Sequence, residues 1–197
     1  MKHLKILGLL AVAAAAMMAF ASAASADDVT SPKGTVYTGH LAAAAEGHAI
    51  LHNPIAEIKC ASTVTGFVEH HEPTEKVRGD ISSLTFGSPV GTCTNSWHVT
   101  VVSGGELSVE WQAGGAGFNG DVYSDGATVE ATRFGITCRY KTETETVGTL
   151  TGGKTATMHI DADIEFHSGS GLCGTDPTEW TGSYILNSPD ELYVDDN

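Results

Sequence analysis

The sequence predicts an all-β protein: an antiparallel β-sandwich-like domain of two related halves, stapled by two disulfides. Three observations predict it. Apolar and polar residues alternate along several segments, glycine-containing pairs separate these segments, and the chain has four cysteines. Alternation with a period of two is the pattern of a half-buried strand, and an even number of cysteines in an exported chain is typical of disulfides.

The first 26 residues have the pattern of a signal peptide. Lys2 and Lys5 supply the positive start, Ile6 to Phe20 is an apolar stretch, and Ala24-Ser25-Ala26 is a cleavage site of small residues. We therefore expect a secreted, extracellular chain that forms a single β domain over 27–197. This part has no stretch approaching 18 apolar residues, so we expect no membrane insertion after cleavage.

The expected mature chain is strongly acidic. All 24 Asp and Glu and eight of the ten Lys and Arg follow residue 26, which gives a net charge of −16. Such a charge repels nucleic acid and anionic membrane surfaces, so we expect no nucleic-acid partner. It suits cations or a basic partner.

Two segments show the strand pattern most clearly. Apolar and polar residues alternate from Leu107 to Trp111, and again from His159 to His167. The alanine-rich run Leu41 to Glu46 has helix-forming residues, but it is short and glycines flank it closely, so we favour a strand or a mixed segment. The run Thr142 to Thr146 is interpreted as an exposed edge or a loop.

Short turns should connect the strands. Residue pairs that tolerate positive φ are typical of tight hairpin turns. The chain has four such pairs: Gly104-Gly105, Asn119-Gly120, Asp125-Gly126 and Gly152-Gly153.

The chain also contains a weak internal repeat, called the echo below, with half-units of about 36–111 and 112–194. The first half contains Ile58-Lys59-Cys60, Leu84-Thr85-Phe86, Cys93 and Trp97, and the second contains Ile136-Thr137-Cys138, Ile164-Glu165-Phe166, Cys173 and Trp180. One structural unit used twice explains the echo. Of the three possible pairings, the echo favours Cys60–Cys93 and Cys138–Cys173. It also favours core or sheet-edge packing for Trp97 and Trp180 over a sugar-stacking role.

Several local motifs resemble those of a large family of exported proteins of unknown function from high-GC Gram-positive bacteria. The motifs are Asn53 to Cys60 followed by Thr63 to Gly66, Gly79 to Phe86 before Cys93, Gly135 to Cys138, Gly182 to Tyr184, and Leu192 to Val194. The resemblance implies an exported β-sandwich-like domain and carries no activity. The order of Cys, Gly, Phe, Cys and Trp along the chain is also similar, more weakly, to that of exported proteins of the alkane-oxidation-activator type.

One segment is a candidate metal site. Every second residue of a strand points to the same face, so five side chains of the second predicted strand should project together. They are His159, Asp161, Asp163, Glu165 and His167. Calcium suits the carboxylates and zinc suits the histidines, but a linear stripe needs further ligands from a neighbouring strand. The alternative is a solvated outer face.

A second group, His70-His71-Glu72, is followed by Pro73, which excludes a zinc-binding helix and places the group on an exposed loop. The chain has no G-x-S-x-G nucleophile motif. We therefore predict an exported, non-catalytic binding or structural protein whose partner is unknown, with cell-surface material and a basic partner as the candidates. We expect no catalytic residue and no cofactor. Two alternatives stay open: an exported hydrolase with a metal or Ser/His/Asp site, and a metal-binding protein that uses the stripe.

Overall fold

The computed structural model describes residues 27–69, 77–112 and 118–196, and the segment that the sequence predicts as a signal peptide lies outside them. The described chain is nearly all β, as predicted. Its strands are β1 (Asp27–Thr30), β2 (Gly39–Ala45), β3 (Ala49–Asn53), β4 (Ala56–Cys60), β5 (Ser62–Val68), β6 (Val77–Phe86), β7 (His98–Ser103), β8 (Glu106–Trp111), β9 (Asn119–Asp125), β10 (Thr128–Arg133), β11 (Ile136–Lys141), β12 (Glu145–Thr151), β13 (Thr157–Gly169), β14 (Thr178–Ser188) and β15 (Tyr193–Asp196).

The described part also contains two short 3-10 helices, η1 (Thr94–Ser96) and η2 (Gly171–Cys173). No helix among the described residues is long and apolar enough to cross a membrane.

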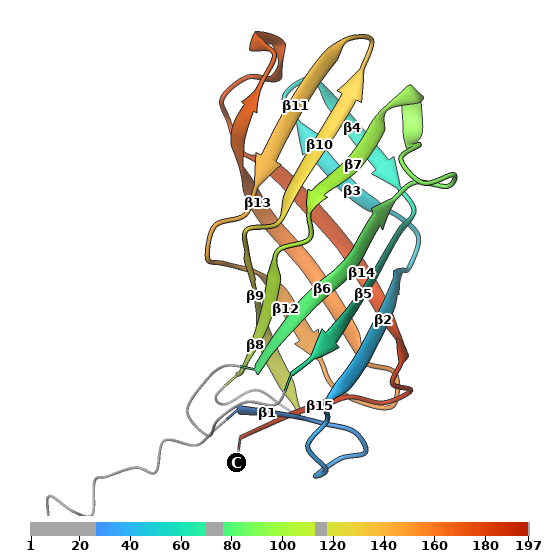
Figure 1. Ribbon diagram of the computed structural model, residues 1–197, viewed down its shortest axis with the longest axis vertical. Coiled ribbons are helices and arrows are strands. Elements are labelled where there is room, and N and C mark those ends of the chain that lie inside the picture. Colours follow the sequence, from blue (N-terminus) through green and yellow to red (C-terminus); the bar gives the residue numbers. More distant parts are fainter. Residues whose placement is uncertain (1–26, 70–76, 113–117, 197) are drawn as a thin grey trace, which may run out of the picture.

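Eight strands close into an antiparallel barrel, in the order β14, β2, β5, β6, β8, β9, β12 and β13 (Figure 1). β13 and β14 close it by pairing from Thr157 opposite Ile185 to Ile164 opposite Thr178. The fold is therefore a barrel with extra strands and not a simple sandwich, which corrects the sequence prediction. The error has a physical reason: period-two alternation is the same in sandwiches and barrels, and only the pairing of the outermost strands distinguishes them.

The extra strands form two wings at one end of the barrel. β13 and β14 are 13 and 11 residues long, so each extends beyond the barrel and can pair there with a further strand. The first part of β14 pairs with β3, which pairs with β4. The last part of β13 pairs with β11, followed by β10 and β7. The disulfide Cys60–Cys93 ties β4 to the loop before β7, and Cys138–Cys173 ties β11 to η2. These are the pairings that the echo favoured.

The two-stranded sheet of β1 and β15 lies across the opposite end of the barrel (Figure 1). Its apolar side chains point into the molecule: Val29 is 3% exposed and Val194 is fully buried. The Thr30 hydroxyl donates a hydrogen bond of 2.5 Å to the Asp195 carboxylate across the pair. This sheet therefore covers the barrel interior.

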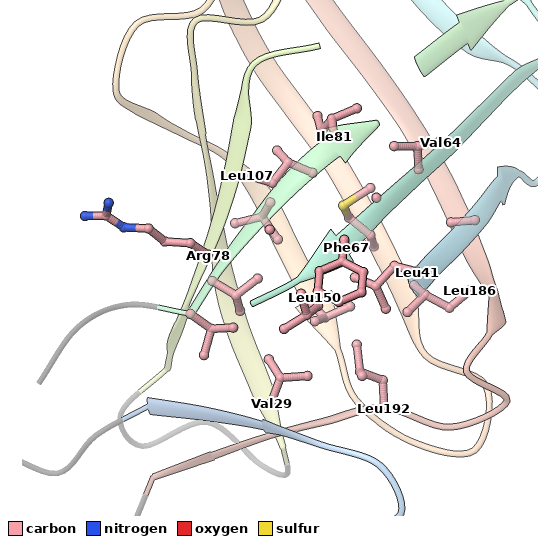
Figure 2. A pocket seen from close by; sticks show the side chains of 18 of the residues that line it. Val29, Leu41, Val64, Phe67, Arg78, Ile81, Leu107, Leu150, Leu186 and Leu192 are labelled. Carbon is pink, nitrogen blue, oxygen red and sulfur yellow. The ribbon is translucent and has the colours of Figure 1, made fainter. Parts of the chain in front are cut away.

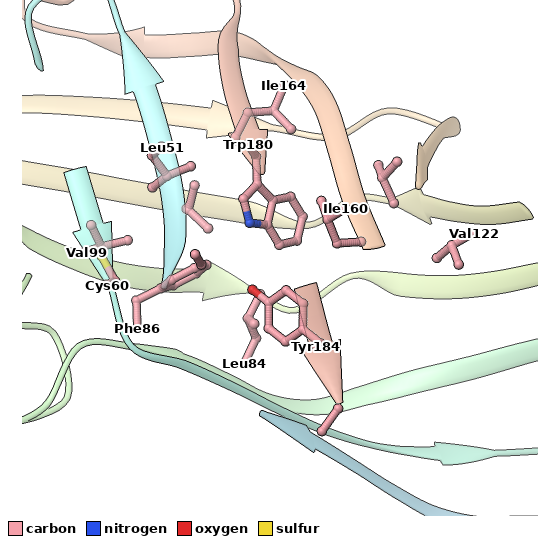
Figure 3. Packing of buried hydrophobic residues seen from close by; sticks show 14 of the residues in the cluster. Leu51, Cys60, Leu84, Phe86, Val99, Val122, Ile160, Ile164, Trp180 and Tyr184 are labelled. Carbon is pink, nitrogen blue, oxygen red and sulfur yellow. The ribbon is translucent and has the colours of Figure 1, made fainter. Parts of the chain in front are cut away.

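Large side chains fill the middle of the barrel (Figure 3). Trp180 and Tyr184 project inward from β14, and the Phe86 ring packs edge-on against Trp180 at a centroid distance of 6.4 Å. The Tyr184 hydroxyl donates to Ser62 Oγ at 3.1 Å, and burial raises the pKa of this phenol. Trp97 is also buried, so both repeated tryptophans belong to the core, as expected.

The predicted strands over 107–111 and 159–167 lie within β8 and β13, and the alanine-rich run lies mostly in β2. The run Thr142 to Thr146 is a loop over 142–144 that leads into β12, and Glu143, Thr144 and Thr146 are exposed, as predicted. Thr142 differs: it is buried, and its hydroxyl accepts a hydrogen bond of 3.0 Å from the Ala127 amide. Threonine occurs both on exposed surfaces and at buried positions where its hydroxyl satisfies other polar groups. Composition alone therefore could not show that Thr142 is buried.

The turn predictions hold in part. Gly152-Gly153 connects β12 and β13, which pair as a hairpin. Gly104-Gly105 and Asp125-Gly126 lie at turns, but each turn links strands that pair with other partners. Asn119-Gly120 begins β9 and is not a turn. A local turn signal cannot say whether the chain returns along the same strand or crosses to another.

Candidate functional site

The acidic and histidine stripe lies along the outer wall of the molecule. All five predicted side chains on β13 are exposed, while Ile160 and Ile164 between them are buried. The alternation is therefore as predicted. Among the described residues, no three His, Cys, Asp or Glu side chains converge to hold a metal ion. The group at 70–72 lies outside the described residues.

The stripe has acidic neighbours on both sides. Asp163 stands opposite Glu179 on β14. On the other side, burial and the charges of Glu165, Glu143 and Asp163 raise the pKa of Glu145, although a hydrogen bond from the Glu143 backbone opposes the shift. This clustering of like charges disfavours ionisation of Glu145.

One serine and one histidine also meet on this wall. The His159 Nδ1 atom lies 3.1 Å from Ser183 Oγ, and both residues belong to the β13–β14 pair. Neither residue borders the barrel cavity described below. The geometry is that of a cross-strand hydrogen bond on an exposed surface, and the hydrolase hypothesis gains no enclosed site from it.

An apolar cavity of about 90 Å³ lies in the barrel, next to the end that β1 and β15 cover (Figure 2). Val29 from β1 and Leu192, just before β15, form its floor. Leu41 and Ala43 from β2, and Leu150 from β12, belong to its walls. A β-strand directs alternate side chains inward, which is why each strand presents its aliphatic residues here.

Two glycines contribute to the volume of the cavity, because they have no side chain. Gly66 on β5 and Gly79 on β6 occupy inward positions of the wall without a side chain. A Cβ atom on Gly66 would lie 2.7 Å from the Asp80 carbonyl oxygen, whereas one on Gly79 would meet its nearest atom, the Phe67 carbonyl oxygen, at 3.5 Å. Close strand packing at a bulge therefore requires Gly66, but packing alone does not require Gly79.

The cavity has apolar walls. The described residues that line it are mostly aliphatic, together with the thioether of Met158 and the aromatic, partly exposed Phe67. Arg78 and Asp80 border the cavity through the wall of β6, but both side chains are exposed, and Figure 2 shows Arg78 pointing away. The chemistry of the cavity is therefore that of dispersion and desolvation.

The cavity continues as a smaller void toward the centre of the barrel. This second void of about 20 Å³ shares Val64, Ile81 and Met158 with the first and ends at Trp180 and Tyr184. Met158 therefore lies at the boundary of both spaces. Methionine is unbranched and adapts its shape readily, so this boundary can adjust to an occupant.

Comparison of the chain with protein-family models, curated proteins and solved structures finds no match.

Sequence reasoning missed the cavity. Its apolar lining has the same pattern as an ordinary core, and only the two inward glycines of β5 and β6 distinguish it. Gly66 and Gly79 are a signal of reduced wall volume only once the register of β5 with β6 places them near each other, and that register leaves no local pattern in the sequence.

Proposed function

We propose that the protein is an exported, non-catalytic binding protein whose eight-stranded barrel takes up a small apolar ligand. The observation that carries the proposal is the cavity of about 90 Å³ with an apolar lining. Barrels of about eight strands have interiors that side chains either fill or leave open for one small ligand. Here the middle is filled, and the end beneath β1 and β15 is not.

The size and chemistry of the cavity define the ligand class. An apolar cavity of about 150 Å³ stays dry and binds benzene, so a space somewhat smaller suits a short alkyl group or the end of an alkyl chain. The lining offers no inward-facing described polar side chain that would fix a headgroup. Affinity should therefore come from the buried methylene groups.

Isothermal titration with a series of 1-alkanols, from four to ten carbons, tests this proposal. Each buried methylene contributes about 0.8 kcal/mol, so the affinity should rise about fourfold per carbon until the cavity is full and then level off. The protein used is the chain from Asp27 on, because all described elements lie within it.

Two neighbouring alanines of β2 supply a matched pair of variants. Ala43 stands opposite Val64 and lines the cavity, while Ala42 stands opposite the exposed Thr65 on the outer face. Ala43→Leu should fill the cavity and abolish alkanol binding, and Ala42→Leu should leave binding unchanged. Absence of saturable binding by the unaltered protein, or equal effects of the two variants, would refute the proposal.

A further inference from the structure

The β3–β4 turn, η2 and the β10–β11 turn lie at the end of the molecule opposite β1 and β15 (Figure 1). Each of the three carries a large apolar side chain that is exposed to solvent. Ile55, between β3 and β4, is 44% exposed, and Leu172 in η2 is 63% exposed. Phe134, between β10 and β11, is 83% exposed. We call these three residues the apolar tips. Exposed apolar side chains are a candidate interaction site when they gather at one end of a protein, whereas single scattered ones are ordinary.

The three turns are neighbours in space. A Cβ atom on Gly174, just after η2, would lie 3.5 Å from Cγ of Pro54 in the β3–β4 turn. On its other side, η2 is joined to β11 by the Cys138–Cys173 disulfide. The backbone amide of Ser170 also donates to the Thr137 carbonyl at 2.9 Å. Contacts on both sides of η2 therefore hold the three tips at one surface.

Phe134 sits in a backbone conformation that does not suit it. Its φ is 48° and that of Gly135 is 79°, so both central residues of the turn are left-handed. Asparagine or glycine normally occupies such positions, and a bulky residue there costs free energy. Burial does not offset this cost, because the side chain is exposed. Strain that packing does not explain is a feature of functional loops.

The charge of this end differs from that of the whole protein. Residues 53–56, 133–136 and 170–175 contain one charged residue, Arg133, although the chain has a formal net charge of −14. Glu57 and Asp176 follow directly after two of these ranges, and Glu57 is paired with Lys59 at 2.8 Å. The Arg133 guanidinium lies 4.7 Å from the centroid of the Phe134 ring and 5.9 Å from that of Trp97. It forms no ion pair with a described residue. The cation therefore stands beside the most exposed apolar tip.

We propose that the apolar tips dock on the interface of a lipid bilayer, with Arg133 against lipid phosphates. Separate tips on three turns can each enter a fluid interface, whereas a protein partner would need a surface shaped to fit all three. Apolar side chains enter the boundary between headgroups and acyl chains, and a neighbouring cation favours the phosphates. The acidic remainder of the surface resists approach to anionic lipid, which leaves this end as the one that can face the membrane.

Sedimentation with lipid vesicles tests the proposal. The chain from Asp27 on is mixed with vesicles of phosphatidylcholine, alone or with one quarter phosphatidylglycerol. The unaltered protein should sediment with the vesicles, and Phe134→Ser should lower the partition coefficient about tenfold or more, because a large apolar side chain no longer enters the interface. Leu172→Ser should lower it as well.

Val102→Ser is the matched control, because Val102 is 55% exposed but lies on β7, away from the tips. It should leave vesicle binding unchanged. Thermal unfolding of each variant verifies that the fold is retained. An unaltered protein that stays in the supernatant with both vesicle types would overturn the proposal, and so would equal losses for Phe134→Ser and Val102→Ser. The alkanol titration needs no vesicles, so this proposal and the proposed ligand can fail separately.

Discussion

Replacement of the two inward glycines of the cavity wall by alanine should change the stability in opposite directions. Gly66 and Gly79 lie on adjacent strands and both border the cavity. A methyl group on Gly79 would keep ordinary contact distances and enter the cavity, whereas one on Gly66 would come within 2.7 Å of the Asp80 carbonyl. The two substitutions add the same atoms, so their difference reports the local geometry alone.

The magnitude for Gly79→Ala follows from two contributions. Glycine within a strand costs roughly 0.5–1 kcal/mol relative to alanine, because the unfolded chain loses more freedom. Burial of one methyl group adds about 0.8 kcal/mol. The variant should therefore gain about 1 kcal/mol or somewhat more, which corresponds to an increase of roughly 2–4 °C in melting temperature for a domain of this size.

Gly66→Ala must displace the backbone of β6 and should lose about 1–3 kcal/mol, the usual cost of overpacking. Calorimetry and urea unfolding of the oxidised protein measure both variants. If Gly79→Ala destabilises the protein, or if the two variants shift the stability in the same direction, then the cavity is not the open space that the structure describes.

Three further predictions concern the remaining features. Because the pKa of Glu145 is raised in the folded protein, the stability linked to its protonated form is present below its ordinary value of 4.5 and is lost as the pH rises through the raised value. Glu145→Gln should therefore raise the melting temperature at pH 7 and have little effect at pH 4; equal effects at both would contradict this. Replacement of Cys138 and Cys173 by alanine opens a loop with a separation of 35 residues and should cost about 3–4 kcal/mol in urea unfolding; a loss below about 1 kcal/mol would refute the loop-entropy reasoning. If the stripe binds calcium, the ion should raise the melting temperature, and Asp161→Asn with Asp163→Asn should abolish that rise; no rise leaves the stripe a solvated face.

The elements that sequence could predict depend on short-range patterns. The alternation along β13 fixes which of its side chains are buried, and the pairing of the cysteines follows from the repeated spacing around them. Barrel closure depends instead on the pairing of β13 with β14 and on the register of β5 with β6. These long-range pairings leave no local pattern, because an inward strand face is apolar in a sandwich and in a barrel alike.

The apolar tip at Phe134 escaped prediction for a different reason. Hairpins with two left-handed residues usually contain asparagine or aspartate before glycine, so Phe134-Gly135 has no recognisable turn signal. A phenylalanine is normally assigned to the core. The structure shows the reverse, and this conflict between residue type and position is what makes Phe134 informative.

The two ends of the barrel use apolar residues in opposite ways, and the two proposals rest on different physical evidence. At the end beneath β1 and β15, the apolar side chains point inward and leave a space, so the argument concerns volume. At the other end they point outward from strained turns, so the argument concerns exposure. A substitution that acts through volume should not change exposure at the far end. Gly79→Ala should therefore alter stability without changing vesicle sedimentation, and Phe134→Ser should alter sedimentation without changing alkanol binding. A variant that moved both readouts would show that the two ends are coupled through the barrel, which their separation in the structure does not predict.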